Sequence, residues 1–251
     1  MMIEWEITLK CNFNCDYCGL LRPIAPVLDE EKISEFIRDL NAKYPNVEWF
    51  IFGGEPFLHP KIDFIISELN KVKQPFVIQT NLSNRSTDVI TKISEPFKFY
   101  CSIHVSQLSL MDAIKNITKT HPNEIHLMYT ENTGKVEEYY KKINIIKGKS
   151  KLILTPVSNL ACSGYTDILK HYDKIKKNYI YDTNTIIYKG KEMLRSDIWM
   201  LQNSQKESLT KGKPCMYKGK YKLFNPALQE MNCCYRKSTN GICDEQNCFF
   251  M

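Results

Sequence analysis

The chain has 251 residues, 43% of them hydrophobic and 12% aromatic, and a net charge of +6 from 34 basic and 28 acidic residues. This composition supplies a sizeable buried core and excludes an intrinsically disordered chain. No apolar run is long enough for a membrane-spanning helix, and the first residues lack the layout of a signal peptide, so we expect a cytoplasmic protein without a membrane partner. The mild positive charge fits solvated helix faces as well as a polyanionic partner.

Short apolar strands alternate with helix-period segments along the first 156 residues. The expected strands cover residues 3–9, 47–52, 75–80, 97–105, 124–129 and 151–156. The expected helices lie between them, at residues 29–44, 61–72, 86–93, 109–117 and 135–146. Strict alternation requires a parallel sheet with right-handed crossovers, so the pattern predicts an α/β fold.

Beyond about residue 157 the alternation weakens. Residues 161–178 have the periodicity of another helix, and residues 179–193 have the pattern of a hairpin. Residues 220–234 (KYKLFNPALQEMNCC) predict a strand, a turn and a strand within a cysteine-rich tail. We therefore expect one domain over residues 1–190 and a small C-terminal extension with a β-hairpin over residues 191–251.

Ten cysteines in a chain without a secretory signal indicate metal binding or catalysis, because a reducing cytoplasm keeps disulfides rare. Eight of them form two groups, which are Cys11, Cys15 and Cys18 near the start and Cys215, Cys233, Cys234, Cys243 and Cys248 near the end. Three thiolates cannot complete a four-coordinate zinc site or a fully protein-ligated cluster unless a remote residue supplies the fourth ligand. The first group therefore predicts a metal position that is open to chemistry.

The spacing of this first group has a family resemblance. Cys11-x3-Cys15-x2-Cys18, with the aromatic Tyr17 before the third cysteine, resembles the signature of the radical S-adenosylmethionine (radical SAM) superfamily. One βα unit later, the sequence Gly53-Gly54-Glu55-Pro56 resembles the GGEP motif of the same superfamily. From the residues alone, a zinc knuckle beside a tight turn is the alternative.

The resemblance implies a fold, two cofactors and a reaction. The fold is a partial (β/α)6 TIM-like barrel, in which the three cysteines hold a [4Fe-4S] cluster whose fourth iron binds SAM. An external electron donor, such as flavodoxin or ferredoxin, reduces the cluster. Reductive cleavage of SAM then gives a 5'-deoxyadenosyl radical, which removes a hydrogen atom from the substrate.

The resemblance also implies contacts to SAM, and strand alternation adds further candidates. By resemblance, Gly53–Glu55 meet the methionyl amino group, and glycines allow backbone carbonyls to approach a ligand closely. Ser102 and His104 share the polar face of their strand. We expect Asn81 and Ser102 to contact SAM and His104 to lie nearer the substrate, with a hydrogen-bonded core residue as an equal alternative for each.

The C-terminal cysteines are similar to the ligands in SPASM and twitch extensions of radical SAM enzymes, where cysteines on both sides of a hairpin help to hold an auxiliary iron–sulfur cluster. The resemblance implies one auxiliary [4Fe-4S] cluster on Cys215, Cys233, Cys243 and Cys248, with Cys234 as the alternative to Cys233. The same thiolates also satisfy a zinc site, so zinc and unligated thiols stay open.

The resemblance favours a peptide or protein substrate, because such extensions are common in enzymes that mature ribosomally made peptides. The ten residues before Cys11 count against it, since many of those enzymes carry a leader-binding domain first. The alternatives are modification of a small molecule, a nucleotide or RNA, and activation of a glycyl-radical enzyme. A zinc-stabilised binding module without catalysis is the non-enzymatic alternative, and it predicts no SAM cleavage.

Overall fold

A computed structural model describes residues 1–15, 18, 26–129, 133–156, 185–188, 191–194 and 221–231, and strands and helices alternate in it as predicted. The first six strands are β1 (Met2–Thr8), β2 (Glu48–Gly53), β3 (Phe76–Thr80), β4 (Lys98–His104), β5 (Glu124–Tyr129) and β6 (Lys151–Pro156). The helices are α1 (Glu30–Lys43), α2 (Ile62–Lys71), α3 (Asn84–Ile90), α4 (Leu110–Thr120) and α5 (Thr133–Ile146), and a short 3-10 helix covers Pro56–Leu58.

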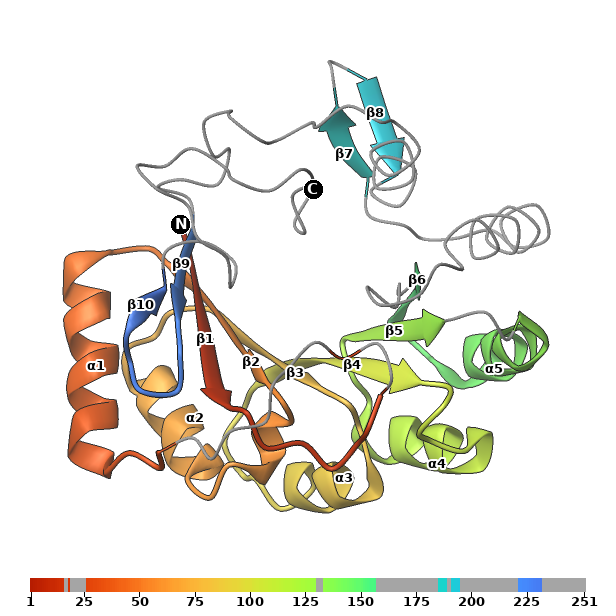
Figure 1. The fold of residues 1–251 in the computed structure, drawn as a ribbon, viewed down its shortest axis with the longest axis horizontal. Coiled ribbons are helices and arrows are strands. Elements are labelled where there is room, and N and C mark those ends of the chain that lie inside the picture. The colour runs from red at the N-terminus through yellow and green to blue at the C-terminus, as the bar shows by residue number, and fades with distance from the viewer. Residues whose placement is uncertain are drawn as a thin grey trace.

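All six strands pair in parallel in sequence order, and they form part of one eight-stranded sheet. The helices follow one side of this curved sheet (Figure 1). This arrangement confirms the predicted α/β partial barrel. Because the strands are parallel, their carboxyl ends meet at one edge of the sheet, where barrel folds build their sites.

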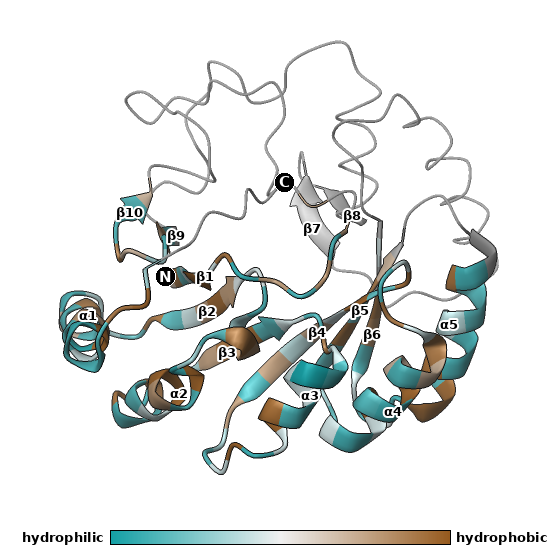
Figure 2. Ribbon diagram, turned by 60° about the horizontal axis from the view of Figure 1, so that its bottom comes forward, coloured by the Kyte–Doolittle hydropathy of each residue, from teal (hydrophilic) through white to brown (hydrophobic). Residues whose placement is uncertain are grey.

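Period-two alternation divides the strand residues between two faces of the sheet. Trp49, Ile51 and Ile78 are fully buried on the face that the helices cover. The helices contribute the other half of this core through apolar stripes, and Figure 2 shows hydrophilic and hydrophobic residues side by side on them. No helix in the described ranges is long and apolar enough to cross a membrane.

The helices begin where the sequence supplies capping side chains. Asp29 accepts a hydrogen bond from the Lys32 amide at the start of α1, and Ser83 and Ser109 cap α3 and α4 in the same way. Each cap satisfies an amide that the first helical turn leaves without a partner. The observed helix ends lie within three residues of the predicted ones.

The two predicted hairpins are also present. β7 (Thr185–Tyr188) and β8 (Lys191–Leu194) pair antiparallel, as do β9 (Tyr221–Phe224) and β10 (Glu230–Met231). β9 also pairs in parallel with β1, so this hairpin extends the barrel sheet beyond its first strand. The domain boundary near residue 190 stays a prediction, and the helix expected over residues 161–178 lies outside the described residues.

An aromatic cluster attaches the β9–β10 hairpin to the barrel. The Phe36 ring of α1 lies 5.0 Å from the Phe224 ring of β9 and 5.0 Å from the Trp5 ring of β1. Phe224 is buried on the same side of the sheet as Trp5, with which it is paired in register. These contacts make the hairpin part of the hydrophobic core.

We therefore expect Phe224→Ala to lower the free energy of unfolding by about 3 kcal/mol, because it removes a buried ring and leaves a cavity. Anaerobic urea unfolding measures this change. Met111→Ala, at a side chain that is 75% exposed, is the control and should change stability by less than about 0.5 kcal/mol. Equal effects of the two substitutions would show that the hairpin is not packed on the core.

Candidate active site

The loop that follows β1 carries the three predicted cysteines along the carboxyl edge of the sheet. Cys11 and Cys15 are half-buried, and Cys18 is exposed. Between them, the Phe13 side chain is buried in the core, and its amide donates a hydrogen bond to Cys11 Sγ at 3.4 Å. A buried anchor in the middle of the loop fixes the backbone that presents the thiols.

The end of β2 fastens this cysteine loop through backbone hydrogen bonds. The Gly54 amide donates to the Thr8 carbonyl at 2.8 Å, and the Glu55 amide donates to the Lys10 carbonyl at 2.8 Å. A Cβ atom on Gly53 would lie 2.2 Å from the Thr8 oxygen, and one on Gly54 would lie 2.5 Å from the Lys10 oxygen. The predicted contact of the Gly53 and Gly54 backbone with SAM stays a prediction. The structure adds a second reason for these glycines, because the backbone before and in the cysteine loop lies against both of them.

The Glu55 side chain connects the end of β2 to the end of β3. Its side chain is fully buried and accepts hydrogen bonds from the Asn81 amide at 2.6 Å, the Thr80 hydroxyl at 2.8 Å and the Phe57 amide at 3.1 Å. Burial raises the pKa of Glu55 to about 7, although these donors oppose the rise. The predicted contact of Glu55 with the SAM amino group stays a prediction.

Asn81 and Ser102 are the residues expected to contact SAM. Asn81 lies next to the cysteine loop, and Ser102 lies below it on the barrel face. Asn81 is buried, and its Nδ2 donates to Asn12 Oδ1 at 2.9 Å and lies 3.7 Å from Cys11 Sγ. Ser102 is also buried, and its hydroxyl accepts a hydrogen bond from Gln79 Nε2 at 2.9 Å. Contacts of Asn81 and Ser102 with SAM stay predictions.

His104, expected nearer the substrate, lies against the cysteine loop. Its Nδ1 is 3.5 Å from Cys15 Sγ, and its ring makes an edge contact with Phe13 at 5.9 Å between centroids. Burial lowers the pKa of His104 to about 4, so the imidazole is neutral at pH 7. A neutral imidazole adds no positive charge beside the thiols.

Gln107 is a site residue that the sequence argument missed. Its Oε1 accepts a hydrogen bond from the Asn14 amide at 3.0 Å, and its Nε2 donates to the Asn14 carbonyl at 3.2 Å. This amide therefore clamps the middle of the cysteine loop from the turn after β4. Its place three residues beyond the end of a parallel strand was the available signal.

Below this edge, the barrel face of β4 to β6 is polar. His126 Nε2 lies 3.3 Å from Glu124 Oε2, and His126 Nδ1 lies 3.3 Å from the Thr155 hydroxyl. The hydrogen bond from His126 lowers the pKa of Glu124. Strand register places Ser102 beside His126 on this face. The predicted orientation of Ser102 and His104 toward the barrel interior is therefore correct.

Several predicted site residues lie outside the described part of the chain, namely Tyr17, Cys215, Cys233, Cys234, Cys243 and Cys248. Within the described part, no three Cys, His, Asp or Glu side chains are grouped closely enough to bind a metal. The donor set nevertheless fits an iron–sulfur cluster, because three thiols share one fastened loop and nitrogen atoms lie next to two of the sulfurs. Cys11, Cys15 and Cys18 are therefore the residues that would hold it.

Comparisons with known proteins identify the family of the chain. The family model described as "Radical SAM superfamily" matches residues 5–149. Among curated proteins, the S-adenosylmethionine-dependent nucleotide dehydratase of Psychrobacter lutiphocae is 26% identical over 176 residues, which make up 64% of this chain and 57% of that protein.

Solved structures share the fold. Streptococcus suis SuiB bound to its precursor peptide SuiA has a TM-score of 0.58 at 15% identity, over 90% of this chain and 57% of SuiB. The enzyme anSMEcpe with bound AdoMet and a peptide has a TM-score of 0.50 at 15% identity, over 90% of this chain and 71% of that protein. The chain thus spans little more than half the length of the dehydratase and of SuiB.

The close contact of Gly53 with the Thr8 carbonyl predicts that any side chain at position 53 destabilises the fold. We expect Gly53→Ala to destabilise the fold by about 3 kcal/mol, because its methyl group would overlap the Thr8 carbonyl. Gly148→Ala is the matched control, since Gly148 also has a positive φ but has nothing within 4 Å of its Cβ position. It should cost about 1 kcal/mol in anaerobic urea unfolding. Equal losses would contradict the packing role of Gly53.

The raised pKa of Glu55 predicts a pH effect with a definite sign. The folded value of about 7 exceeds the ordinary value of 4.5, so the folded chain holds the proton more tightly than the unfolded chain. The contribution of Glu55 to the free energy of unfolding should therefore fall by about 3 kcal/mol as pH rises through this window, and then level off. The measurement compares the parent with Glu55→Gln at several pH values. Parallel curves for the two proteins would contradict the assignment.

Proposed function

Because the chain belongs to the radical SAM superfamily, we propose that it is a SAM-dependent enzyme that modifies a peptide or protein, with Cys11, Cys15 and Cys18 as the cluster ligands. The superfamily uses a [4Fe-4S] cluster and SAM, which together supply a carbon radical that removes a hydrogen atom from the substrate. The chain itself contributes binding, orientation and exclusion of water. The observation that carries the proposal is the fastening of the cysteine loop at the carboxyl edge of the barrel.

Three parts of the chain converge on that loop. Gly54 and Glu55 bind its first residues by backbone hydrogen bonds, and Asn81 and Gln107 bind Asn12 and Asn14 by their side-chain amides. A loop held from β2, β3 and β4 keeps its thiols in place. This preorganisation is what a cofactor site needs from its protein.

The barrel face is better suited to a peptide than to a polyphosphate. On the described strands, the lysines of this face are Lys98 and Lys151, and both stand at the first residue of their strand, away from the cysteine loop. Glu124, whose pKa is lowered by the hydrogen bond from His126, adds negative charge to the same face, which would repel phosphates. Ser102, Gln79 and His126 offer hydrogen bonds that suit amide groups. SuiB and anSMEcpe, which share the fold, were solved with peptides.

A nucleotide is the second candidate substrate, and one specific observation favours it. The curated relative with 26% identity is a nucleotide dehydratase. A nucleotide would need cationic partners for its phosphates from outside the described strands. A nucleotide substrate therefore requires basic side chains from the rest of the chain, whereas a peptide substrate does not.

The tail supports a further part of the proposal. We propose that Cys215, Cys233, Cys243 and Cys248 hold an auxiliary [4Fe-4S] cluster, with Cys234 as the alternative to Cys233. β10 ends at Met231, so one residue, Asn232, separates Cys233 from the barrel sheet. An external donor such as flavodoxin or ferredoxin supplies the electron.

The substrate class can be tested by isotope transfer. The reconstituted, reduced enzyme and SAM are incubated anaerobically with a small-molecule and peptide extract from cells grown in D2O, and deuterium in 5'-deoxyadenosine is measured by mass spectrometry. We expect deuterium transfer that disappears when the extract is treated with protease and survives phosphatase. The Cys15→Ala variant is the blank.

The opposite pattern would contradict the peptide proposal. Transfer that phosphatase abolishes and protease leaves intact would identify a nucleotide. Transfer that survives both treatments would identify another small molecule. Formation of no deoxyadenosine by the parent, even with strong reductant, would contradict the proposed reaction.

A further inference from the structure

We propose that Asn116, a side chain of α4, positions Asn81 as a hydrogen-bond donor to the Cys11 thiolate and thereby raises the reduction potential of the cluster that Cys11 helps to hold. Asn116 lies outside the cysteine loop and would touch neither cluster nor substrate. It is therefore a positioning residue. The inference rests on the cluster of the superfamily and is independent of the substrate class.

The turn between β3 and α3 has an unusual backbone. Leu82, which follows Asn81, has φ +49° and is fully buried. A residue other than glycine rarely adopts this left-handed backbone conformation, and it persists only where the surrounding structure holds it. The direction in which Asn81 points therefore depends on what holds Leu82.

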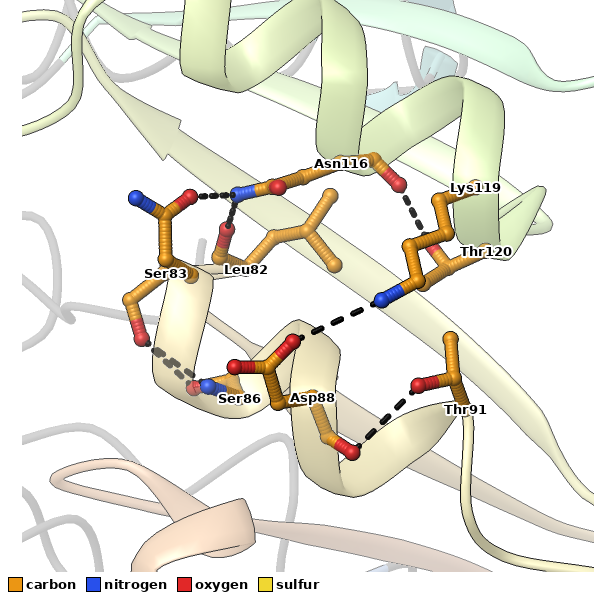
Figure 3. A network of polar contacts seen from close by, with 9 residues as sticks. Leu82, Ser83, Ser86, Asp88, Thr91, Asn116, Lys119 and Thr120 are labelled. Carbon is orange, nitrogen blue, oxygen red and sulfur yellow. Dashed lines mark hydrogen bonds and ion pairs between the residues drawn. The ribbon is translucent and has the colours of Figure 1, made fainter.

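Asn116 holds Leu82 in this conformation. Its Nδ2 donates to the Leu82 carbonyl at 2.9 Å and to Asn84 Oδ1 at 2.9 Å, so both amide hydrogens are used (Figure 3). Only 1% of the Asn116 residue is exposed, so water cannot replace these bonds. A buried amide from a neighbouring helix thus clamps the turn.

The remaining contacts orient the Asn81 amide. Its Oδ1 accepts hydrogen bonds from the Ser83 amide at 3.0 Å and the Ser86 hydroxyl at 3.4 Å. Because the oxygen side faces the start of α3, the NH2 side faces the cysteine loop, where it bonds Asn12 and lies 3.7 Å from Cys11 Sγ. The network fixes Asn81 as a donor toward the sulfur.

A donor at a cluster thiolate has a predictable electrochemical effect. Hydrogen bonds to the sulfur atoms withdraw negative charge and favour the reduced, more negative cluster. Loss of the donor should therefore make the reduction potential more negative. Loss of the clamp should have the same effect, because it releases the donor.

The test measures the midpoint potential and the electron paramagnetic resonance spectrum of the reconstituted holoenzyme, without substrate. The variants are Asn81→Leu, Asn116→Leu and their combination. Lys119→Ala is the control, because it removes the exposed ion pair to Asp88 between the same two helices and leaves the Asn116 bonds in place (Figure 3). A variant with the cluster at Cys11, Cys15 and Cys18 alone, lacking the tail cysteines, serves as the common background.

We expect both single variants to shift the potential in the negative direction and change the g values, and the control to match the parent. The double variant should shift no further than Asn81→Leu, because both residues act through one contact. Loss of iron from both single variants, with the control retaining it, also supports the positioning role. If Asn116→Leu does not melt cooperatively, Asn116→Ser replaces it.

Three results would overturn the inference. An unchanged potential in Asn81→Leu would remove the donor role. A shift in Asn81→Leu without one in Asn116→Leu, or Asn116→Ser in its place, would remove the positioning role. Additive shifts in the double variant would show that the two residues act separately. These measurements use no substrate. They therefore test the inference even if the deuterium-transfer experiment finds no peptide substrate.

Discussion

Two backbone hydrogen bonds, from the amides of Gly54 and Glu55 to the carbonyls of Thr8 and Lys10, join the end of β2 to the start of the cysteine loop. They continue the pairing of β1 and β2 beyond the regular strands, past a register shift near Thr8. The close approach requires two consecutive glycines, since a Cβ on either would overlap a carbonyl oxygen. The sheet therefore extends directly into the site, and the position of the thiols follows from the fold.

Glu55 links the end of β2 to the neighbouring strand β3 at the same edge of the sheet. Its buried carboxyl group binds the ends of β2 and β3 together, and the same turn of β3 carries Asn81 to the cysteine loop. Burying an ionisable group is unfavourable unless its oxygens find donors, and here the chain supplies three of them. Beneath the cysteine loop, the core is therefore held by the hydrogen bonds of Glu55, whereas hydrophobic packing holds it under the helices.

Sequence patterns predicted the fold because its signals are local. Alternating periodicities gave all six barrel strands and both hairpins, and strand alternation placed Ser102 and His104 on the barrel face. The motif glycines were found by resemblance, but the backbone that lies against them was not predicted, because Thr8 and Lys10 are far from them in the sequence. Asn116 carries no local signal and Gln107 carries only its place after a strand, because each acts on a residue far away in the sequence. Side-chain bonds between distant segments are a tertiary property.

We propose that Cys11, Cys15 and Cys18 hold the cluster at which SAM is cleaved. The direct measurement counts iron and sulfide after anaerobic reconstitution of the parent and of a variant with these three cysteines changed to alanine, and follows deoxyadenosine formation under dithionite. We predict about eight irons in the parent, about four in the variant, and deoxyadenosine from the parent alone. Equal iron contents, or deoxyadenosine from both proteins, would contradict the claim.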